Sequence, residues 1–385
     1  HCNLGVIFFF NKCNSFLSFD CLTSQYYRYG IYFPGGRILG FCNSRNIFQH
    51  SHGLRDSGIS SILYRKSFNM VNKKIVCLGG GVGTVNLLLG LRKYFSDISV
   101  VMSMADEGGS SGRLRRLYDI HPPGDLISCM AALSKNENLS KFLIYRFPGD
   151  RYAKDSLLDG HKLGNLMMVG AINSTGDFNK SIHFLQKIFN IPGNFLPATF
   201  ERIKISAKTI EGREIFGEEN IDLGKYKGER VLDRIFLHPQ KPKAFSETIR
   251  RLKEADVIIG GPGDLYTNLL PVLIVPDISK IVKSSKAQKI FVVNVANKPF
   301  ETRGYDVSDY IAAIKRHIGF FPFKKIIVNN DFTVNIPRRF HYNYVKFKNK
   351  KAANGFLVFE KKLIDENFPL YHDSSKLAKA ILSCV

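Results

Sequence analysis

The sequence predicts an α/β fold with a Rossmann-like, mainly parallel sheet, helices on both faces and a small β-hairpin insertion. Three observations lead to this fold class. Short apolar runs rich in β-branched residues alternate with segments of helical periodicity. Two of these runs stop at glycine clusters, and an apolar share of 44% is ample for a large core. Strands separated by helices pair in parallel, and parallel sheets are covered on both faces.

The elements follow one another in a regular order. The first predicted strand, 74–78, ends in a glycine run, and a helix over 84–94 and a strand over 98–104 come next. Further helices are predicted over 125–133, 139–146, 162–173, 179–189 and 308–317. Further strands are predicted over 255–259, 289–295 and 325–329. Residues 202–208 and 213–216 are predicted to form the hairpin around Glu211-Gly212.

Residues 1–69 differ from the rest of the chain. They hold two acidic and seven basic residues and sustain no helical or strand periodicity. Met70 stands directly before the first predicted strand. We therefore expect 1–69 to be an atypical extension outside the fold and 70–385 to form a single α/β domain. The alternative is that 1–69 is a genuine targeting or accessory segment.

The charge of the chain is strongly basic, with a formal net charge of +22. Beyond residue 69 the chain still holds 48 basic and 31 acidic residues. Such a charge is typical of nucleic-acid or membrane-surface binding. The basic residues are scattered, however, without interleaved aromatic residues, so no specific nucleic acid is expected. A homodimer is a general expectation for an open parallel sheet.

Cysteine spacing and hydropathy narrow the class of protein further. The seven cysteines form no C-x-x-C pair and no cluster with zinc spacing. Cys77 lies inside an apolar strand, where we expect a buried, inert thiol. No apolar run reaches the length of a membrane helix. We therefore expect a cytoplasmic protein with no membrane span.

The most informative segment is 104–115, M-A-D-E-G-G-S-S-G-R-L-R. Glycines let backbone amides converge on an anion, and serine and arginine side chains add donors that suit phosphate. The carboxylates of Asp106 and Glu107 could hold a metal ion or a sugar hydroxyl, or form a solvated turn. The candidate ligand-binding residues here are Asp106, Gly108, Gly109, Ser110, Ser111 and Arg113.

Two glycine loops join strands to helices, at 79–84 and at 260–263. A helix N-terminus supplies unpaired amides and a partial positive charge. The first loop is not a Walker A loop, and it fits G-x-G-x-x-G poorly because Asn86 stands at the third glycine position. A tight turn without a ligand is the alternative. Two backbone cradles on one sheet edge suit a diphosphate, with candidate residues Gly80, Gly81, Gly83, Thr84, Gly261 and Gly263.

Four further polar residues stand near predicted element ends. Asp125 is placed as a helix N-cap or as a ligand contact. His161 and Asn165 are four residues apart and share a face if both are helical. His161 could be structural or could transfer a proton, which makes it a catalytic candidate with Asp106 and Glu107. Asn294 ends a strand and falls at the sheet edge of the glycine loops.

In order, these segments resemble the gluconeogenesis factor family, relatives of 2-phospho-L-lactate transferase. The matching segments are G-G-G-V-G-T, A-D-E-G-G-S-S-G-R-L-R, P-P-G-D, G-H-K-L-G-N-L, T-G-D-F, G-P-G-D-L-Y-T and E-T-R-G-Y. The sequence departs from the family at Glu107, where a second aspartate is usual, and at Val82, where threonine is usual. None of the matching segments lies within residues 1–69.

The resemblance implies a bacterial cytoplasmic protein with two alternative functions. The gluconeogenesis factors are linked to cell shape and wall synthesis during gluconeogenic growth, and to binding of a UDP-sugar such as UDP-N-acetylglucosamine. The transferases move a phospholactyl group from a GDP-linked donor to a deazaflavin alcohol, and Asp106 and Glu107 would then hold Mg²⁺. We favour a UDP-sugar-binding regulator without turnover, so no cofactor is certain. A nucleic-acid binder is the weaker third alternative.

Overall fold

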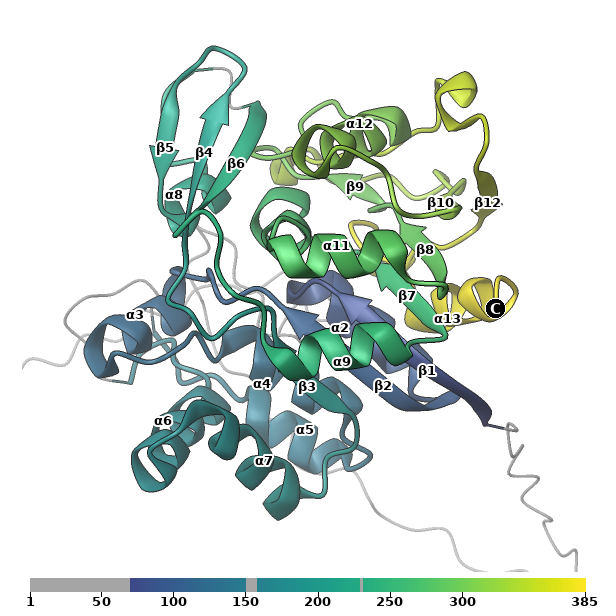
Figure 1. Cartoon of the computed structure of the whole chain (residues 1–385). Coiled ribbons are helices and arrows are strands. Elements are labelled where there is room, and N and C mark those ends of the chain that lie inside the picture. Colours follow the sequence, from purple (N-terminus) through teal and green to yellow (C-terminus); the bar gives the residue numbers. More distant parts are fainter. Residues whose placement is uncertain (1–69, 150–157, 229–230) are drawn as a thin grey trace, which may run out of the picture. The chain divides into compact units, whose positions relative to one another are not determined.

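A seven-stranded parallel sheet forms the centre of the fold (Figure 1). The computed structural model describes residues 70–149, 158–228 and 231–385, which all fall within one compact unit, 51–385. The strand order is β12-β10-β8-β7-β1-β2-β3, and every neighbouring pair is parallel. The strands are β1 Val71–Leu78, β2 Phe95–Met102, β3 Asn194–Pro197, β7 Val257–Gly260, β8 Gln288–Val292, β10 Lys325–Asn329 and β12 Leu357–Lys361. The predicted fold class is confirmed.

Helices cover both faces of the sheet. In Figure 1, α9 (Ser246–Glu254) and α11 (Pro276–Ser284) cross the near face. On the far face, α2 (Gly81–Leu91) packs against α13 (Ser374–Leu382). The other long helices are α3 Gly109–Tyr118, α4 Gly124–Leu133, α5 Glu137–Ile144, α6 Leu163–Thr175, α7 Phe178–Phe189 and α12 Val307–Ile318. Within the described ranges no single helix is long and apolar enough to cross a membrane.

The direction of winding reverses between β1 and β7. The chain adds β2 and β3 on one side of β1, and β7, β8, β10 and β12 on the other. Such a reversal opens a crevice at the carboxyl ends of the two diverging strands, and open α/β sheets bind ligands there. Both glycine loops start at these strands, since β1 ends at Leu78 and β7 ends at Gly260. The topology therefore places them side by side.

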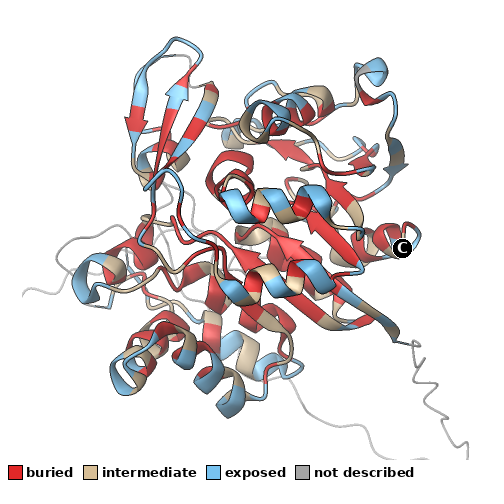
Figure 2. Cartoon of the chain, viewed as in Figure 1, coloured by how far each residue is buried: buried red, intermediate tan, exposed pale blue. Residues whose placement is uncertain are grey.

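The core consists of strand side chains and the inner faces of the helices. Ile75, Cys77 and Ile259 have no exposed surface, and the outward faces of α9 and α11 are exposed (Figure 2). Burial of apolar surface contributes about 25 cal/mol per Å² to stability. Burial also raises the pKa of Cys77 to about 12, so the thiol is inert as predicted.

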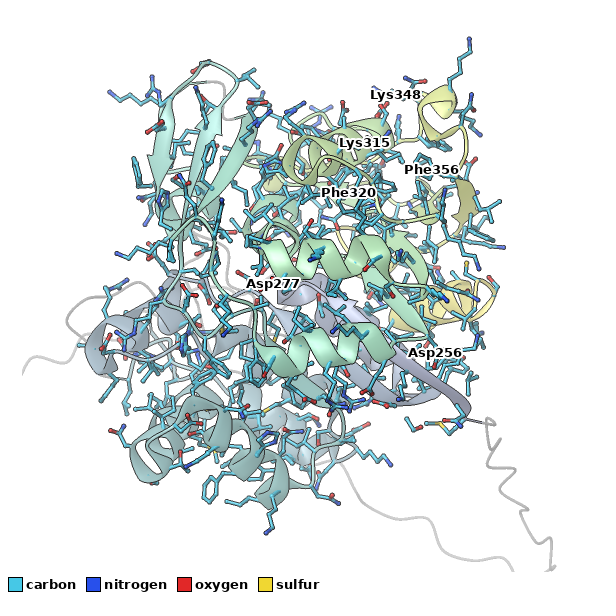
Figure 3. The ribbon with its side chains drawn as sticks, in the orientation of Figure 1. Asp256, Asp277, Lys315, Phe320, Lys348 and Phe356 are labelled. Atoms are coloured by element: carbon cyan, nitrogen blue, oxygen red, sulfur yellow. The ribbon has the colours of Figure 1, made fainter. Side chains whose placement is uncertain are left out.

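Side-chain contacts join neighbouring elements around the sheet, among them those of Asp256, Lys315 and Phe356, which are labelled in Figure 3. The carboxylate of Asp256, just before β7, accepts a hydrogen bond from the backbone amide of Lys74 on β1 at 2.8 Å. The ammonium group of Lys315 on α12 lies 5.8 Å from the ring centre of Phe356, which precedes β12. These contacts fasten strands and helices that are far apart in the sequence.

A second, antiparallel sheet confirms the predicted hairpin and extends it. Strand β4 (Lys204–Thr209) pairs with β5 (Glu214–Phe216) on one side and with β6 (Leu232–His238) on the other. We did not predict β6 from the sequence, because β6 pairs with β4, which ends more than twenty residues earlier. The short helix α8 (Glu218–Asp222) follows β5 and contacts β4.

Several boundaries differ from the prediction. Helix α2 begins at Gly81 rather than at residue 84, so the glycine run itself forms the first helical turn. Segment 109–118 is the helix α3, which we did not predict because glycines, serines and arginines give it a weak apolar face. The strands β3 and β12 and the helices α9, α11 and α13 were also not predicted.

Candidate functional site

The two glycine loops meet backbone to backbone. A Cβ atom on Gly83 would lie 2.6 Å from the carbonyl oxygen of Pro262 and 2.8 Å from the amide nitrogen of Gly263. The hydroxyl of Thr84 donates to the same carbonyl at 3.3 Å. Only glycine fits this approach. The two loops therefore adjoin, as expected from their places at one edge of the sheet. Their contacts with a ligand stay a prediction.

Side chains of the protein contact both loops. Asn294 accepts from the amide of Gly263 at 3.0 Å and donates to the carbonyl of the same residue at 2.9 Å. Asn268 lies over the first loop, 3.1 Å from the positions of Cβ atoms added to Gly80 and Gly81. Asn294 thus holds the second loop in shape.

Asp125 lies at the N-terminus of α2 rather than capping its own helix. We predicted an N-cap, but α4 begins at Gly124 and its N-cap residue is Pro123. The Asp125 carboxylate instead accepts a hydrogen bond from the amide of Gly81 and fills the space where Gly80 lacks a side chain. The N-cap prediction is wrong because Asp125 is already the second residue of α4, and its side chain instead reaches an amide more than forty residues earlier. A carboxylate thus binds one amide of the first loop, that of Gly81.

The environment of Asp125 disfavours its charge. Burial, followed by the nearby carboxylate of Asp106, raises the pKa of Asp125 to about 7, although Lys162 and the Gly81 amide act in the opposite direction. Asp264 adds further repulsion. The site therefore contains a carboxyl group that titrates near neutral pH.

Segment 104–115 forms the second wall of the site. The carboxylate of Asp106 accepts a hydrogen bond from the amide of Gly108 at 2.9 Å. Gly108 is the N-cap residue of α3, which begins at Gly109. Amides in the first turn of a helix have no intrahelical acceptor. Arg115 donates to the carbonyls of Met104, Asp106 and Ile203, so it holds the segment in place. Gly108, Gly109, Ser110 and Ser111 thus form the N-terminus of α3, and Arg113 lies buried within the helix.

Glu107 faces a different element from Asp106. Its carboxylate accepts from the backbone amide of Glu218 at 3.3 Å, and the carboxylate of Glu218 accepts from the amide of Glu107 at 3.2 Å. This reciprocal pair ties segment 104–115 to α8. The longer glutamate side chain at position 107 therefore has a structural partner 111 residues later.

Ser110, His161 and Asn165 form a buried cluster. Ser110 Oγ lies 2.8 Å from His161 Nδ1 and accepts a hydrogen bond from Asn165 Nδ2 at 3.0 Å. His161 precedes α6 and Asn165 lies in its first turn, so both reach α3 although His161 is not helical. Burial, followed by the cations of Arg113 and Arg146, lowers the pKa of His161 to about 4. The imidazole is therefore neutral at pH 7.

Lys298 lies at the centre of a group of three carboxylates that sequence reasoning missed. Its ammonium nitrogen is 2.8 Å from Asp264 and 3.4 Å from Glu301, and it also pairs with Asp222. Burial opposes the charge of Lys298, but the three carboxylates outweigh burial and hold its pKa well above the usual value. In the described ranges this is the one group of three acidic side chains with metal-like spacing. Lysine occupies its centre.

The sequence offered only part of the signal for this cluster. Asp264 and Glu301 lie within motifs that we quoted, and Glu301 also accepts from the amide of Tyr266 and the hydroxyl of Thr267. Asp222 and Lys298 lie in no motif that the sequence analysis identified. They meet only because tertiary packing places α8, which ends at Asp222, beside Lys298.

A family model described as 2-phospho-L-lactate transferase CofD matches residues 75–367. The chain belongs to this family. The gluconeogenesis factor of Bacillus subtilis (strain 168) is 36% identical over 315 residues, covering 80% of this chain and 97% of that protein. The gluconeogenesis factor of Halalkalibacterium halodurans is 35% identical over 322 residues, covering 81% and 97%. The resemblance to gluconeogenesis factors is thereby confirmed.

Solved structures agree with the family assignment. A crystal structure of a Bacillus halodurans protein has a TM-score of 0.73 and 34% sequence identity to this chain. The match covers 80% of this chain and 99% of the other. The fold described above is therefore the fold of the family.

Proposed function

We propose that the protein binds a nucleotide diphosphate, specifically a UDP-sugar, at the reversal point of the sheet, and that it acts as a cytoplasmic regulator without turnover. The observation that carries the proposal is the meeting of three helix N-termini, those of α2, α3 and α4, beside two adjoining glycine loops. Helix N-termini favour anions, and closely spaced ones favour a ligand with more than one phosphate. Asp106 would accept from a ribose or sugar hydroxyl.

The relatives support the regulatory part of the proposal. Those compared above are named gluconeogenesis factors, and each matches this chain over almost its whole length. We infer a role in cell shape and wall synthesis during growth on gluconeogenic carbon. A UDP-sugar suits such a role, because it is a precursor of the wall.

The transferase alternative requires Mg²⁺ at Asp106 and Glu107, and these residues fit it poorly. Glu107 is bound to the amide of Glu218, whereas Asp106 is bound to the amide of Gly108, so the two carboxylates serve different elements. The carboxylate group around Lys298 already holds a cation from the chain. These contacts favour binding over metal-assisted transfer.

A thermal-unfolding screen tests the proposal. The full chain is heated with UDP-N-acetylglucosamine, with GDP, and with GDP plus Mg²⁺. A ligand that binds only the native state at about one hundred times its Kd stabilises by about 2.7 kcal/mol. We expect UDP-N-acetylglucosamine to raise the unfolding temperature without Mg²⁺. Stabilisation by GDP with Mg²⁺ and none by the UDP-sugar would favour the transferase instead.

A further inference from the structure

Ser110 is the second residue of α3, and its hydroxyl oxygen is contacted from two sides. Asn165 Nδ2 donates to it at 3.0 Å, and His161 Nδ1 lies 2.8 Å away. The three residues are at most 5% exposed. A serine hydroxyl has one proton to donate and two positions at which it can accept. Whether the Ser110 hydroxyl donates to a ligand or accepts from it depends on which ring nitrogen of the neutral His161 carries the proton.

Resting on the proposed function, we infer that His161 and Asn165 are positioning residues that turn the Ser110 hydroxyl into a donor for a phosphate oxygen. His161 carries its proton on Nδ1 and donates to Ser110 Oγ, as Asn165 does. Both accepting positions of the oxygen are then filled. The Ser110 proton is left to point at an anion beside the N-terminus of α3, where the helix also favours negative charge.

The same cluster supplies a second contact for the ligand. Within the described residues, Asn165 Oδ1 is buried and has no hydrogen-bond partner. A buried acceptor without a donor is destabilising, so such atoms are rare in native proteins. Because Nδ2 of the same amide is held by Ser110, Oδ1 lies within a few ångströms of the proposed phosphate. It would accept from a hydroxyl or amide N–H carried by the ligand, as a sugar diphosphate provides.

Isothermal titration of the full chain with UDP-N-acetylglucosamine and with inorganic pyrophosphate tests this assignment. Ser110→Ala removes one hydrogen bond to a charged group and should weaken both probes by about tenfold to hundredfold. His161→Ala should weaken them similarly, and His161→Asn, which keeps an N–H near the Nδ1 position, should recover most of the loss. Asn165→Ala should weaken the sugar nucleotide more than pyrophosphate. Ser174→Ala, an exposed serine on α6, is the matched control.

A double variant separates positioning from a merely structural role. If His161 acts through Ser110, then Ser110→Ala with His161→Ala should bind no more weakly than Ser110→Ala alone. Losses that add would overturn the inference, as would a Ser110→Ala affinity within about twofold of the wild type. A covalent adduct on Ser110 would also overturn it, because His161 would then be a base. If the wild type binds neither probe, the proposed function itself fails. Should His161→Ala not fold, His161→Asn and Ser110→Ala still decide.

Discussion

Asp125 accepts a hydrogen bond from the amide of Gly81 while facing Asp106 and Asp264, with Lys162 as its nearby cation. Its pKa rises from 3.8 to about 7 on folding. Between these two pKa values the folded protein keeps a proton that the unfolded chain releases. The free energy of unfolding therefore falls as the pH rises from 3.8 to about 7. The Asp125 carboxyl group, which lies at the N-terminus of α2, becomes charged near neutral pH.

We expect Asp125→Asn to remove this pH dependence. The amide oxygen can still accept from Gly81. Relative to the wild type, the variant should gain up to about 4 kcal/mol in free energy of unfolding between pH 4 and pH 8. Urea unfolding at several pH values measures the difference, with the exposed Glu214→Gln as the control. Parallel curves for Asp125→Asn and the wild type would show that Asp125 is charged throughout.

Lys298 illustrates how a buried cation holds acidic residues together. Lys298→Met would leave Asp222, Asp264 and Glu301 without their shared partner. Removing one member of a buried ion pair typically costs about 3–5 kcal/mol. Lys350→Met is the matched control, because Lys350 pairs with Glu360 on the surface and exposed pairs contribute about 1 kcal/mol or less. Equal unfolding free energies for the two variants would contradict the buried role of Lys298.

At the scale of elements, the contact between α2 and the loop after β7 fixes the crevice. Gly83→Ala would force a Cβ atom against the backbone of Pro262 and Gly263. Overpacking of this kind costs about 1–3 kcal/mol. Gly170→Ala on α6 is the control, because nothing lies within 4 Å of its added Cβ atom, and alanine should stabilise that helix by up to about 1 kcal/mol. Thermal unfolding of both variants should shift in opposite directions, and a neutral Gly83→Ala would mean the loops are not packed.

Elements with local signals were predicted, and elements that depend on distant partners were not. The apolar runs of β1, β7 and β8, and the glycines at the ends of β1 and β7, are legible in the sequence, so the parallel sheet and the adjoining loops followed. Helix α3 was missed because its glycines, serines and arginines give it little apolar periodicity, and it packs against α6, which lies far along the chain. The partner of Glu107 could not be predicted, since Glu218 belongs to an element whose position only tertiary packing sets.

At the scale of the whole molecule, a strongly basic chain carries an acidic crevice. The chain has a net charge of +22, yet Asp106, Asp125, Asp264 and Glu218 gather around the reversal point of the sheet. The crevice offers carboxyl oxygens as acceptors as well as helix N-termini. It suits a small ligand whose sugar hydroxyls can donate to carboxylates while its phosphates reach the N-terminus of α3.

Amide hydrogen exchange with and without UDP-N-acetylglucosamine tests the central claim most directly, because it reports both binding and its location. Ligand contact slows exchange where amides are covered or held. We predict slower exchange in peptides that span 79–84, 106–112 and 261–264, and unchanged exchange in α5 and α7. Protection confined to other segments, or no protection at a saturating concentration, would contradict a nucleotide-sugar site at the reversal point of the sheet.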